Sequence, residues 1–451
     1  MCIYVRVDML LQKKSVRGLL WVWLGLVFGL SAPTTALAAT AYDFESDVAI
    51  GWFELFYDTV KAQGMAPPVA ARAYGIAGVT LYQAVVPGMP EHATLSGQVN
   101  QLGATPKGIP GYAYHWPAVA NKALAVVGAT LFAAAPAANL AALNTYYKQN
   151  SWAYRLQLPY SNFQRSEKLG LDIANAVLAW AATDGASQAM TNCVYTPPQT
   201  PEAWKPTPPA FAPNPALPCW GSVRPFVLTT PDQCAPNQPI PYSEDPASEF
   251  YADAWEVYET GTTLSNDEAT IALYWADGPK DTGTPPGHWV AVTSQLLGDM
   301  DLSLGDAAEA YARVGMAVAD AFIACWHTKY KYNLLRPVTY IQKVIDPSWM
   351  PYITTPAFPE YTSGHSTQSG AACVVLTQFF GNMPFTDFTH QAHGQLPTLA
   401  PRSFNNFIEA AAEAAMSRLY GGIHYSTGNM KGLTQGECIG FAIENKITFV
   451  K

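Results

Sequence analysis

The chain has 451 residues, of which 49% are hydrophobic and only 13% are charged, and its formal net charge is −9. This composition excludes a disordered chain, and the length allows a large buried core in one to three domains. The acidic balance argues against nucleic acid or an anionic membrane as the main partner, so a local cluster of Lys and Arg carries more information.

The first 38 residues have the pattern of a secretion signal. Three basic residues between positions 13 and 17 precede an apolar stretch at 19–30, and Ala36-Leu37-Ala38 forms a small-x-small cleavage site. The apolar stretch is short for a membrane-spanning helix, so a membrane anchor is the weaker alternative. We expect cleavage before Ala39 and a secreted or periplasmic mature protein with a formal charge of −12 and no further membrane-spanning helix.

Apolar residues recur at spacings of three and four over most of the chain, which predicts α-helices. No clear strand alternation or internal repeat is present. We therefore expect an all-α fold, a bundle of ten or more helices, with an N-terminal helical half at 39–193 and a C-terminal catalytic half at 247–451. The predicted helices span residues 48–64, 68–86, 116–134, 136–148, 161–183, 246–260, 265–276, 287–298, 304–330, 364–380, 403–420 and 430–446.

Residues 194–246 have a different composition. Proline is frequent there, which excludes helix over most of the segment, and the Gly/Ser-rich or highly charged composition of a flexible linker is absent. We expect an ordered connection that packs over the helices through Trp204, Phe211 and Trp220.

Six cysteines follow the predicted signal. Those in or beside the Pro-rich segment are candidates for a disulfide in an oxidising compartment, with the pairing open. Those in apolar helical patterns are expected to be small core residues. The first group is Cys193, Cys219 and Cys234, and the second is Cys325, Cys373 and Cys438.

The segment that contains Lys329, Arg336 and Pro337 places two cations at a helix end. Proline disfavours helical geometry at the residue before it, so the helix that begins at 304 should end near Asn333. Lys329 then lies in the last turn and Arg336 just beyond, where both can reach one site. The alternative is a solvated helix end.

The next segment, Thr362-Ser363-Gly364-His365, precedes a predicted helix. Ser363 and Gly364 occupy the positions of the N-cap and the first free N–H groups, which bind anions through unpaired donors and the helix dipole. Ordinary capping by Ser363 is the competing interpretation.

The third segment runs from Ser417-Arg418 to His424. Gly421-Gly422 ends the preceding helix. The resulting turn lies between Arg418 and His424 and allows their side chains to converge. Together the three segments supply three fixed cations, a hydroxyl, a glycine N–H and two imidazoles. That set suits a tetrahedral oxyanion such as phosphate or vanadate.

The patterns Lys-x6-Arg-Pro, Ser-Gly-His and Ser-Arg-x5-His, in this order, resemble those of the vanadium-dependent haloperoxidase and type 2 phosphatidic acid phosphatase superfamily, and most closely its bacterial secreted haloperoxidase-like branch. The resemblance implies an all-α fold of two helical bundles. It implies that a bound vanadate supports the oxidation of a halide by hydrogen peroxide.

The resemblance also implies a role for each motif residue. His424 would bond the vanadium of vanadate, or carry the phosphoryl group in a phosphatase. His365 would be the acid–base residue. The remaining residues would hold the oxyanion through charge or hydrogen bonds, and they are Lys329, Arg336, Arg418, Ser363 and Gly364.

Further positions resemble the haloperoxidase branch. Asp277 falls where members of this branch have an Asp that pairs with the last Arg of the motifs, here Arg418. Trp326 and Phe358 fall where chloroperoxidase-like members have a Trp and a Phe beside the halide pocket. The chain departs from the family four residues after the axial His, where Gly428 replaces an Asp that orients that His. Asn429 could replace the Asp in orientation but not in charge.

Other histidines receive plainer interpretations. His390 and His393 with Asp387 could form a metal site, but such a loop pattern is more often solvated surface. His288 is a candidate for a supporting contact to the Asp277 segment.

Three functions remain open at this stage. The first is a secreted vanadate-dependent haloperoxidase that uses hydrogen peroxide and halide. The second is an acid phosphatase that uses a small phosphoester, a phospho-His424 intermediate and no cofactor. The third is a non-catalytic oxyanion-binding helical protein, suggested by Gly428. The sequence does not reveal an oligomeric state.

Overall fold

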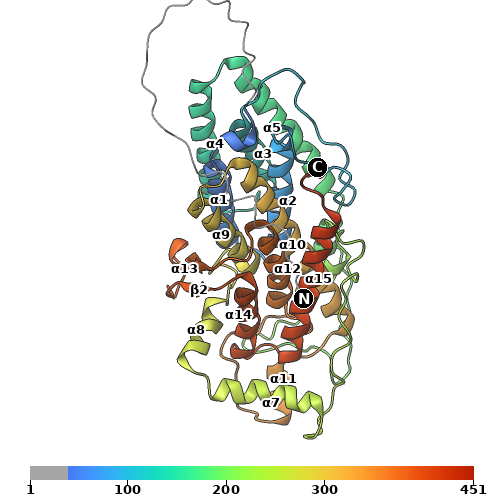
Figure 1. The fold of residues 1–451 in the computed structure, drawn as a ribbon. Coiled ribbons are helices and arrows are strands. Elements are labelled where there is room, and N and C mark those ends of the chain that lie inside the picture. The colour runs from blue at the N-terminus through green and yellow to red at the C-terminus, as the bar shows by residue number, and fades with distance from the viewer. Residues whose placement is uncertain (1–38) are drawn as a thin grey trace, which may run out of the picture. The chain divides into compact units, whose positions relative to one another are not determined.

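The computed structural model describes residues 39–451, which form mainly α-helices (Figure 1). The first half contains α1 (Asp47–Gln63), α2 (Pro67–Val85), α3 (Trp116–Leu131), α4 (Ala137–Gln157), α5 (Tyr160–Ala181), α6 (Ala186–Thr191) and three 3₁₀ turns, η1 (Ala41–Asp43), η2 (Val86–Gly88) and η3 (Trp220–Ser222). The second half contains α7 (Glu249–Thr262), α8 (Asn266–Tyr274), α9 (Thr284–Asp299), α10 (Leu304–Tyr332), α11 (Pro337–Val344), α12 (Gly364–Phe380), α13 (Thr389–Ala392), α14 (Phe407–Tyr420) and α15 (Ser426–Lys446).

The prediction of an all-α fold is confirmed. In the described part of the chain, the strands are limited to β1 (Phe385–Asp387) and β2 (Arg402–Phe404), which pair antiparallel with Phe385 opposite Phe404. The short helices α6, α11 and α13 were not predicted, because elements of one or two turns show too little apolar periodicity. The predicted secretion signal lies outside the described residues and stays a prediction.

Helix α10 forms the centre of the fold. It is 29 residues long and buried on almost every side, with α2 and α12 packed against it. Small residues allow this close approach: a Cβ atom at Gly78 of α2 would lie 2.3 Å from the main-chain oxygen of Tyr311. Helices α12 and α15 meet in the same way, since a Cβ at Gly436 would lie 2.0 Å from the main-chain oxygen of Thr367.

We expected no helix after the signal to be long and apolar enough to span a membrane. This expectation was wrong, because one helical segment meets both criteria. The helical segment Pro67–Gly88 is long and apolar enough, but 89% of its apolar window is buried inside the protein. This segment contains α2, whose apolar character is explained by its central position.

The Pro-rich connection contains no α-helix and packs over the bundle as expected. Trp204 and Trp220 are buried, but Phe211 is 59% exposed, so its predicted packing role was wrong. Phe211 lies in a turn with φ +46° in which its N–H bonds the oxygen of Thr207, and this turn directs the ring outward. Asp320 of α10 anchors the connection by accepting three main-chain N–H groups from residues 226–228 at 2.6–2.9 Å.

Two disulfides hold the connection. One joins Cys193 to Cys219, and the other joins Cys234 to Cys438 of α15. The core role predicted for Cys438 was therefore wrong: this residue is exposed, and helical periodicity does not show which segment lies against it. Cys325 and Cys373 are buried and free, as predicted.

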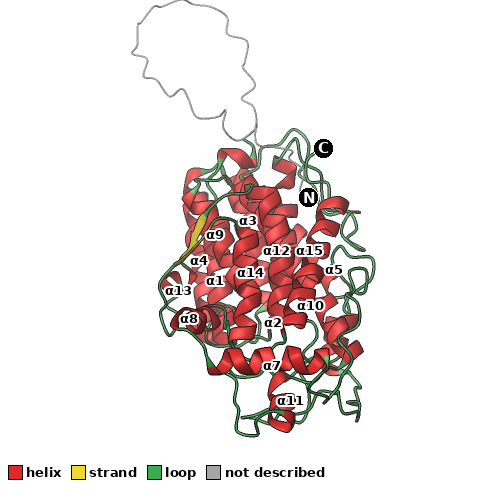
Figure 2. Ribbon diagram, turned by 60° about the horizontal axis from the view of Figure 1, so that its bottom comes forward, coloured by secondary structure: helices red, strands yellow, loops and turns green. Residues whose placement is uncertain are grey.

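Helix α7 lies across one end of the bundle beside α11, as Figure 2 shows. A small apolar cluster joins this end to the rest of the protein, with Phe250 of α7, Val338 and Ile341 of α11, and Tyr425 at the start of α15. This cluster fixes the loops that carry the candidate site.

Candidate active site

The end of α10 places the first two cations. Asn333 caps the helix with φ +51°, which ends it at the predicted position. Arg336 then has the extended backbone that a following proline requires, and Pro337 begins α11. The chain thus turns sharply after Lys329 and brings Arg336 back towards it.

Lys329 is fully buried and is held by main-chain oxygens. Its Nζ lies 2.9 Å from the oxygen of Pro359 and 2.8 Å from that of Glu360. The ammonium also lies over the rings of Trp326 and Phe358, at 5.7 and 5.2 Å from their centroids. These contacts fix its position without neutralising its charge.

Arg336 is also fully buried. Its Nε donates to the oxygen of Phe358 at 2.8 Å, and its Nη1 donates to the oxygen of Ile423 at 2.8 Å and to Nε2 of His424 at 3.0 Å. Its Nη2 is buried without a hydrogen-bond partner among the described residues. One strong donor therefore remains for a bound group.

Arg418, in the last turn of α14, faces the other histidine. Its Nη1 lies 3.4 Å from Nε2 of His365, while its Nη2 and Nε bond the oxygen of Ala272 at 3.2 Å and the hydroxyl of Ser417 at 3.1 Å. The turn at Gly422, with φ +74°, then brings His424 back into the site. After burial, the charges of Arg336, Lys329 and Arg418 lower the pKa of His424, so Arg418 and His424 lie near each other.

The Ser-Gly-His segment forms the start of α12. Ser363 is the N-cap, and its Oγ accepts from the N–H of Ser366 at 3.3 Å and from the Ser366 hydroxyl at 2.8 Å. Its own hydroxyl proton is free to donate, so capping and oxyanion binding are compatible. Gly364 is the first residue of the helix, where N–H groups lack intrahelical partners, and His365 follows, partly exposed.

A buried carboxylate that the sequence did not indicate contacts His424. Oε1 of Glu360 lies 2.6 Å from Nδ1 of His424 and 3.2 Å from the N–H of Tyr425. Asn429 does not take this place; its Oδ1 instead lies 3.4 Å from the hydroxyl of Ser366. No pattern around Glu360 marks it, because the contact joins residues 64 positions apart.

Burial lowers the pKa of Arg418, and Asp277 lies close enough for its charge to oppose that shift. The hydrogen bond of Asp277 is to another residue, since its Oδ2 lies 2.9 Å from Nδ1 of His288. The Nε2 of His288 lies 2.7 Å from Asp387, and this buried pair of carboxylates raises the pKa of His288 to about 10 against the opposing effect of burial. His288 is therefore a cation that links the Asp277 segment to β1.

The prediction that the loop with His390 and His393 is solvated surface was wrong for His390. This residue is buried, with Nε2 2.9 Å from the oxygen of Tyr274 and its ring stacked on that of Tyr274. His393 stacks on Tyr57 and lies 3.4 Å from Glu54. Across residues 39–451, no group of three His, Cys, Asp or Glu side chains is arranged to hold a metal cation.

Two aromatic residues line the cationic site. Trp326 is buried, and its ring centroid lies 4.9 Å from that of the partly buried Phe358. The guanidinium of Arg336 lies 4.9 Å from the centroid of Phe358. These rings exclude water from one side of the charged groups.

The electrostatics of the site favour an anion. Burial lowers the pKa of Lys329 to about 7 and those of Arg336 and Arg418 to about 10. Burial and then the neighbouring cations hold the pKa values of His365 and His424 well below the usual value. Burial also raises the pKa of Glu360 to about 7, so three buried cations with at most one carboxylate beside them are costly unless an anion joins them.

The residues therefore fit an oxyanion such as vanadate. Nη2 of Arg336 is an unpaired buried donor, and the start of α12 adds further donors. Because Arg336 donates to Nε2 of His424, this nitrogen is unprotonated, and its lone pair can bond the central atom once the oxyanion accepts the Arg336 N–H in its place. The arrangement places one nucleophilic nitrogen, Nε2 of His424, beside the three cations Lys329, Arg336 and Arg418 and the start of α12. We call these cations and N–H donors the cradle.

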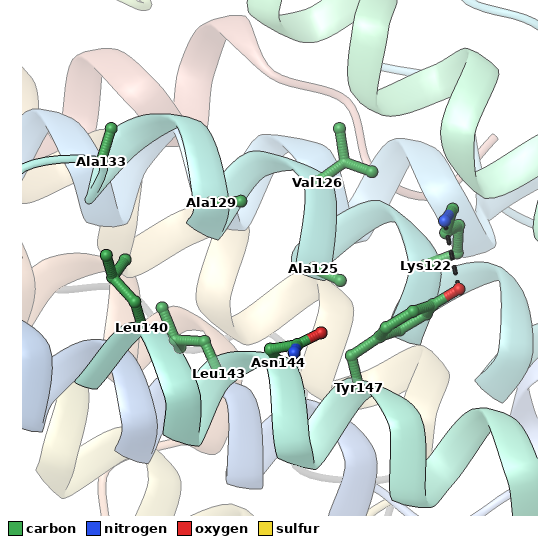
Figure 3. A pocket seen from close by; sticks show the side chains of 9 residues that line it. All are labelled: Lys122, Ala125, Val126, Ala129, Ala133, Leu140, Leu143, Asn144 and Tyr147. Carbon is green, nitrogen blue, oxygen red and sulfur yellow. Dashed lines mark hydrogen bonds between the residues drawn. The ribbon is translucent and has the colours of Figure 1, made fainter. Parts of the chain in front are cut away.

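A separate hollow lies between α3 and α4 (Figure 3). Apolar side chains line most of it, and Lys122 bonds the hydroxyl of Tyr147 at 3.1 Å at one end. None of the candidate site residues lines this hollow.

Comparison with known proteins gives consistent matches. The family model described as the VCPO second helical-bundle domain matches residues 309–348 and 343–450. The vanadium chloroperoxidase of Curvularia inaequalis is 30% identical over 144 residues, which cover 26% of this chain and 24% of that protein.

Solved structures match over most of the chain. The structure of the first bacterial vanadium-dependent iodoperoxidase aligns with a TM-score of 0.83 and 33% identity, and the match covers 90% of this chain and 98% of that one. A holo-type bacterial vanadium-dependent chloroperoxidase aligns with a TM-score of 0.63 and 15% identity over 86% and 95% of the two chains, which shows a shared fold.

Proposed function

Since this chain belongs to the vanadium-dependent haloperoxidase family, we propose that it oxidises halide with hydrogen peroxide at a vanadate bound by His424. The observation that carries this proposal is that three buried cations, Lys329, Arg336 and Arg418, lie near His424, whose Nε2 accepts from Arg336. This set of groups matches the charge and the donor requirements of a tetrahedral oxyanion.

The proposed holding residues act through charge and donors. Lys329, Arg336 and Arg418 neutralise the oxygens, and Ser363 with the N–H of Gly364 donates hydrogen bonds. When bound, vanadate would supply the activation of hydrogen peroxide towards attack by a halide, so that hydrogen peroxide, one halide ion and one proton give hypohalous acid and water.

His365 is placed for proton transfer. Since Arg418 donates to its Nε2 at 3.4 Å, this nitrogen is unprotonated and can accept a proton from hydrogen peroxide. Burial and the charge of Arg418 keep the pKa of His365 low, which maintains the neutral form at neutral pH. Partial exposure of His365 leaves it within reach of a substrate.

Iodide is the first halide to consider. The relative that is 33% identical over almost its whole length is a bacterial vanadium-dependent iodoperoxidase, and iodide is the most easily oxidised of the common halides. Trp326 and Phe358 form the apolar wall at which a weakly hydrated anion loses little solvation.

We further propose that the enzyme acts outside the cytoplasm. The sequence of residues 1–38 has the pattern of a secretion signal, and two disulfides join the Pro-rich connection to itself and to α15.

The test is peroxide-dependent oxidation of iodide, bromide and chloride by the purified protein before and after addition of orthovanadate. Hydrolysis of p-nitrophenyl phosphate is measured beside it without vanadate. Halide oxidation that depends on vanadate is expected. Phosphate release inhibited by vanadate, with no halide oxidation, would contradict the proposal and favour a phosphatase.

A further inference from the structure

The position four residues after His424 holds no side chain. Gly428 lies in the first turn of α15, and a Cβ atom built there would be 2.2 Å from Oε1 of Glu360 and 2.9 Å from its Cδ. The Glu360 carboxylate thus fills the space that a side chain at position 428 would need.

The carboxylate is built into the site. Glu360 is 0% exposed, and its Oε1 accepts from both Nδ1 of His424 and the N–H of Tyr425. Its Oε2 has no hydrogen-bond partner among the described residues. A buried carboxylate with an unpaired oxygen is costly to the fold, so a functional reason for it is expected.

The contacts of His424 define its tautomer. Arginine can only donate, so Nε2 must accept from Nη1 of Arg336, and the ring proton must lie on Nδ1. That proton points to Glu360 at 2.6 Å. Glu360 therefore holds the ring so that Nε2 presents its lone pair to the cradle.

We propose that Glu360 is the positioning residue of His424 and that it replaces, from a different segment, the carboxylate that the chain lacks at Gly428. This inference rests on the proposed function for its readout. It predicts that a carboxylate can serve at position 360 or at position 428, but not at both.

The placement also explains why one loop organises the site. The main-chain oxygens of Phe358, Pro359 and Glu360 hold the Arg336 and Lys329 side chains, while the side chain of Glu360 holds His424. A displacement of this loop would disturb Lys329, Arg336 and His424 together.

The test is the affinity for orthovanadate, measured by isothermal titration calorimetry, for Glu360→Gln, Glu360→Ala, Gly428→Asp and the double variant Glu360→Ala/Gly428→Asp. Both substitutions of Glu360 are expected to weaken binding about 10–100-fold. Gly428→Asp alone is expected to weaken binding, because two carboxylates would compete for one space. The double variant is expected to bind more tightly than Glu360→Ala.

Glu309→Gln is the matched control. Glu309 is also a buried glutamate that contacts a histidine, His92 at 2.8 Å, but it lies outside the cradle. Its substitution is expected to lower the free energy of unfolding and to leave vanadate affinity unchanged. If Glu360→Ala does not fold, Glu360→Gln and the double variant carry the test.

Failure of this inference differs from failure of the proposed function. A wild-type protein that does not bind vanadate would overturn the proposed function. A wild-type protein that binds vanadate, together with folded Glu360 variants of equal affinity, would overturn only the role of Glu360. A folded double variant that binds no more tightly than Glu360→Ala would also overturn it.

Discussion

The buried ammonium of Lys329 is held by the main-chain oxygen of Glu360 at 2.8 Å rather than by a carboxylate. Within residues 39–451, no salt bridge to Lys329 is present. Burial therefore lowers the pKa of Lys329 to about 7, and the charge of Arg336 contributes. A bound anion would therefore stabilise the charged form of this lysine.

The pH dependence of vanadate binding follows from this pKa. A bound oxyanion stabilises the ammonium and raises the pKa of Lys329 above its value of about 7 in the free protein. The gain in affinity is complete below pH 7 and is lost as the pH rises through the bound-state pKa. Calorimetry between pH 6 and 9, in buffers of different ionisation enthalpy, should show proton uptake on binding above pH 7.

Lys329→Met is the matched variant for this pH dependence. It should bind vanadate more weakly at every pH and should lack the proton uptake that Lys329 provides. Equal proton uptake by Lys329→Met and the wild type would show that another group titrates.

Arg418→Ala should lower the rate of halide oxidation about 10²–10³-fold. This arginine is a buried donor aimed at the cradle, and such donors contribute most where charge develops in the transition state. The kcat and KM for halide, with vanadate held saturating, provide the measurement. Arg402→Ala, which removes a partly exposed arginine bonded to Glu413, should change the rate little.

His365→Gln should separate proton transfer from oxyanion binding. Its Nε2 contacts Arg418 at 3.4 Å, and Arg418 has further bonds to Ser417 and to the oxygen of Ala272 that do not involve His365. We expect kcat to fall about 10²–10⁴-fold, as for loss of an acid–base group, with vanadate affinity within a few-fold of wild type. A parallel loss of affinity and rate would assign His365 to binding instead.

The Cys234–Cys438 disulfide should stabilise the mature fold. It closes a separation of 204 residues and ties the Pro-rich connection to α15. Cys234→Ser/Cys438→Ser should lower the free energy of unfolding by about 2–5 kcal/mol in urea titrations. The Cys193–Cys219 bond closes only 26 residues, so its removal should cost less on the loop-entropy argument. The reverse order would contradict this account.

Long helices and the motif residues were predictable from the sequence. Apolar periodicity sustained over several turns indicated α1, α5, α10 and α12 nearly to their ends, and proline chemistry placed the end of α10 at Asn333. Periodicity could not reveal α11, which spans two turns and begins at the proline that ends the preceding extended segment.

Contacts between distant segments were not predictable. The bond between Glu360 and His424 depends on how two loops meet, and the only local sign of it was the missing side chain at Gly428. The partner of Cys438 depended in the same way on the path of the Pro-rich connection. Local propensity carries no information on such pairs.

The central claim is that the cradle binds one oxyanion through His424. The most direct measurement is the stoichiometry and affinity of orthovanadate binding to wild-type protein and to His424→Ala, each shown to be folded by circular dichroism. The account predicts one vanadate per chain for the wild type and no saturable binding for His424→Ala. Binding of equal stoichiometry and affinity by His424→Ala would contradict it.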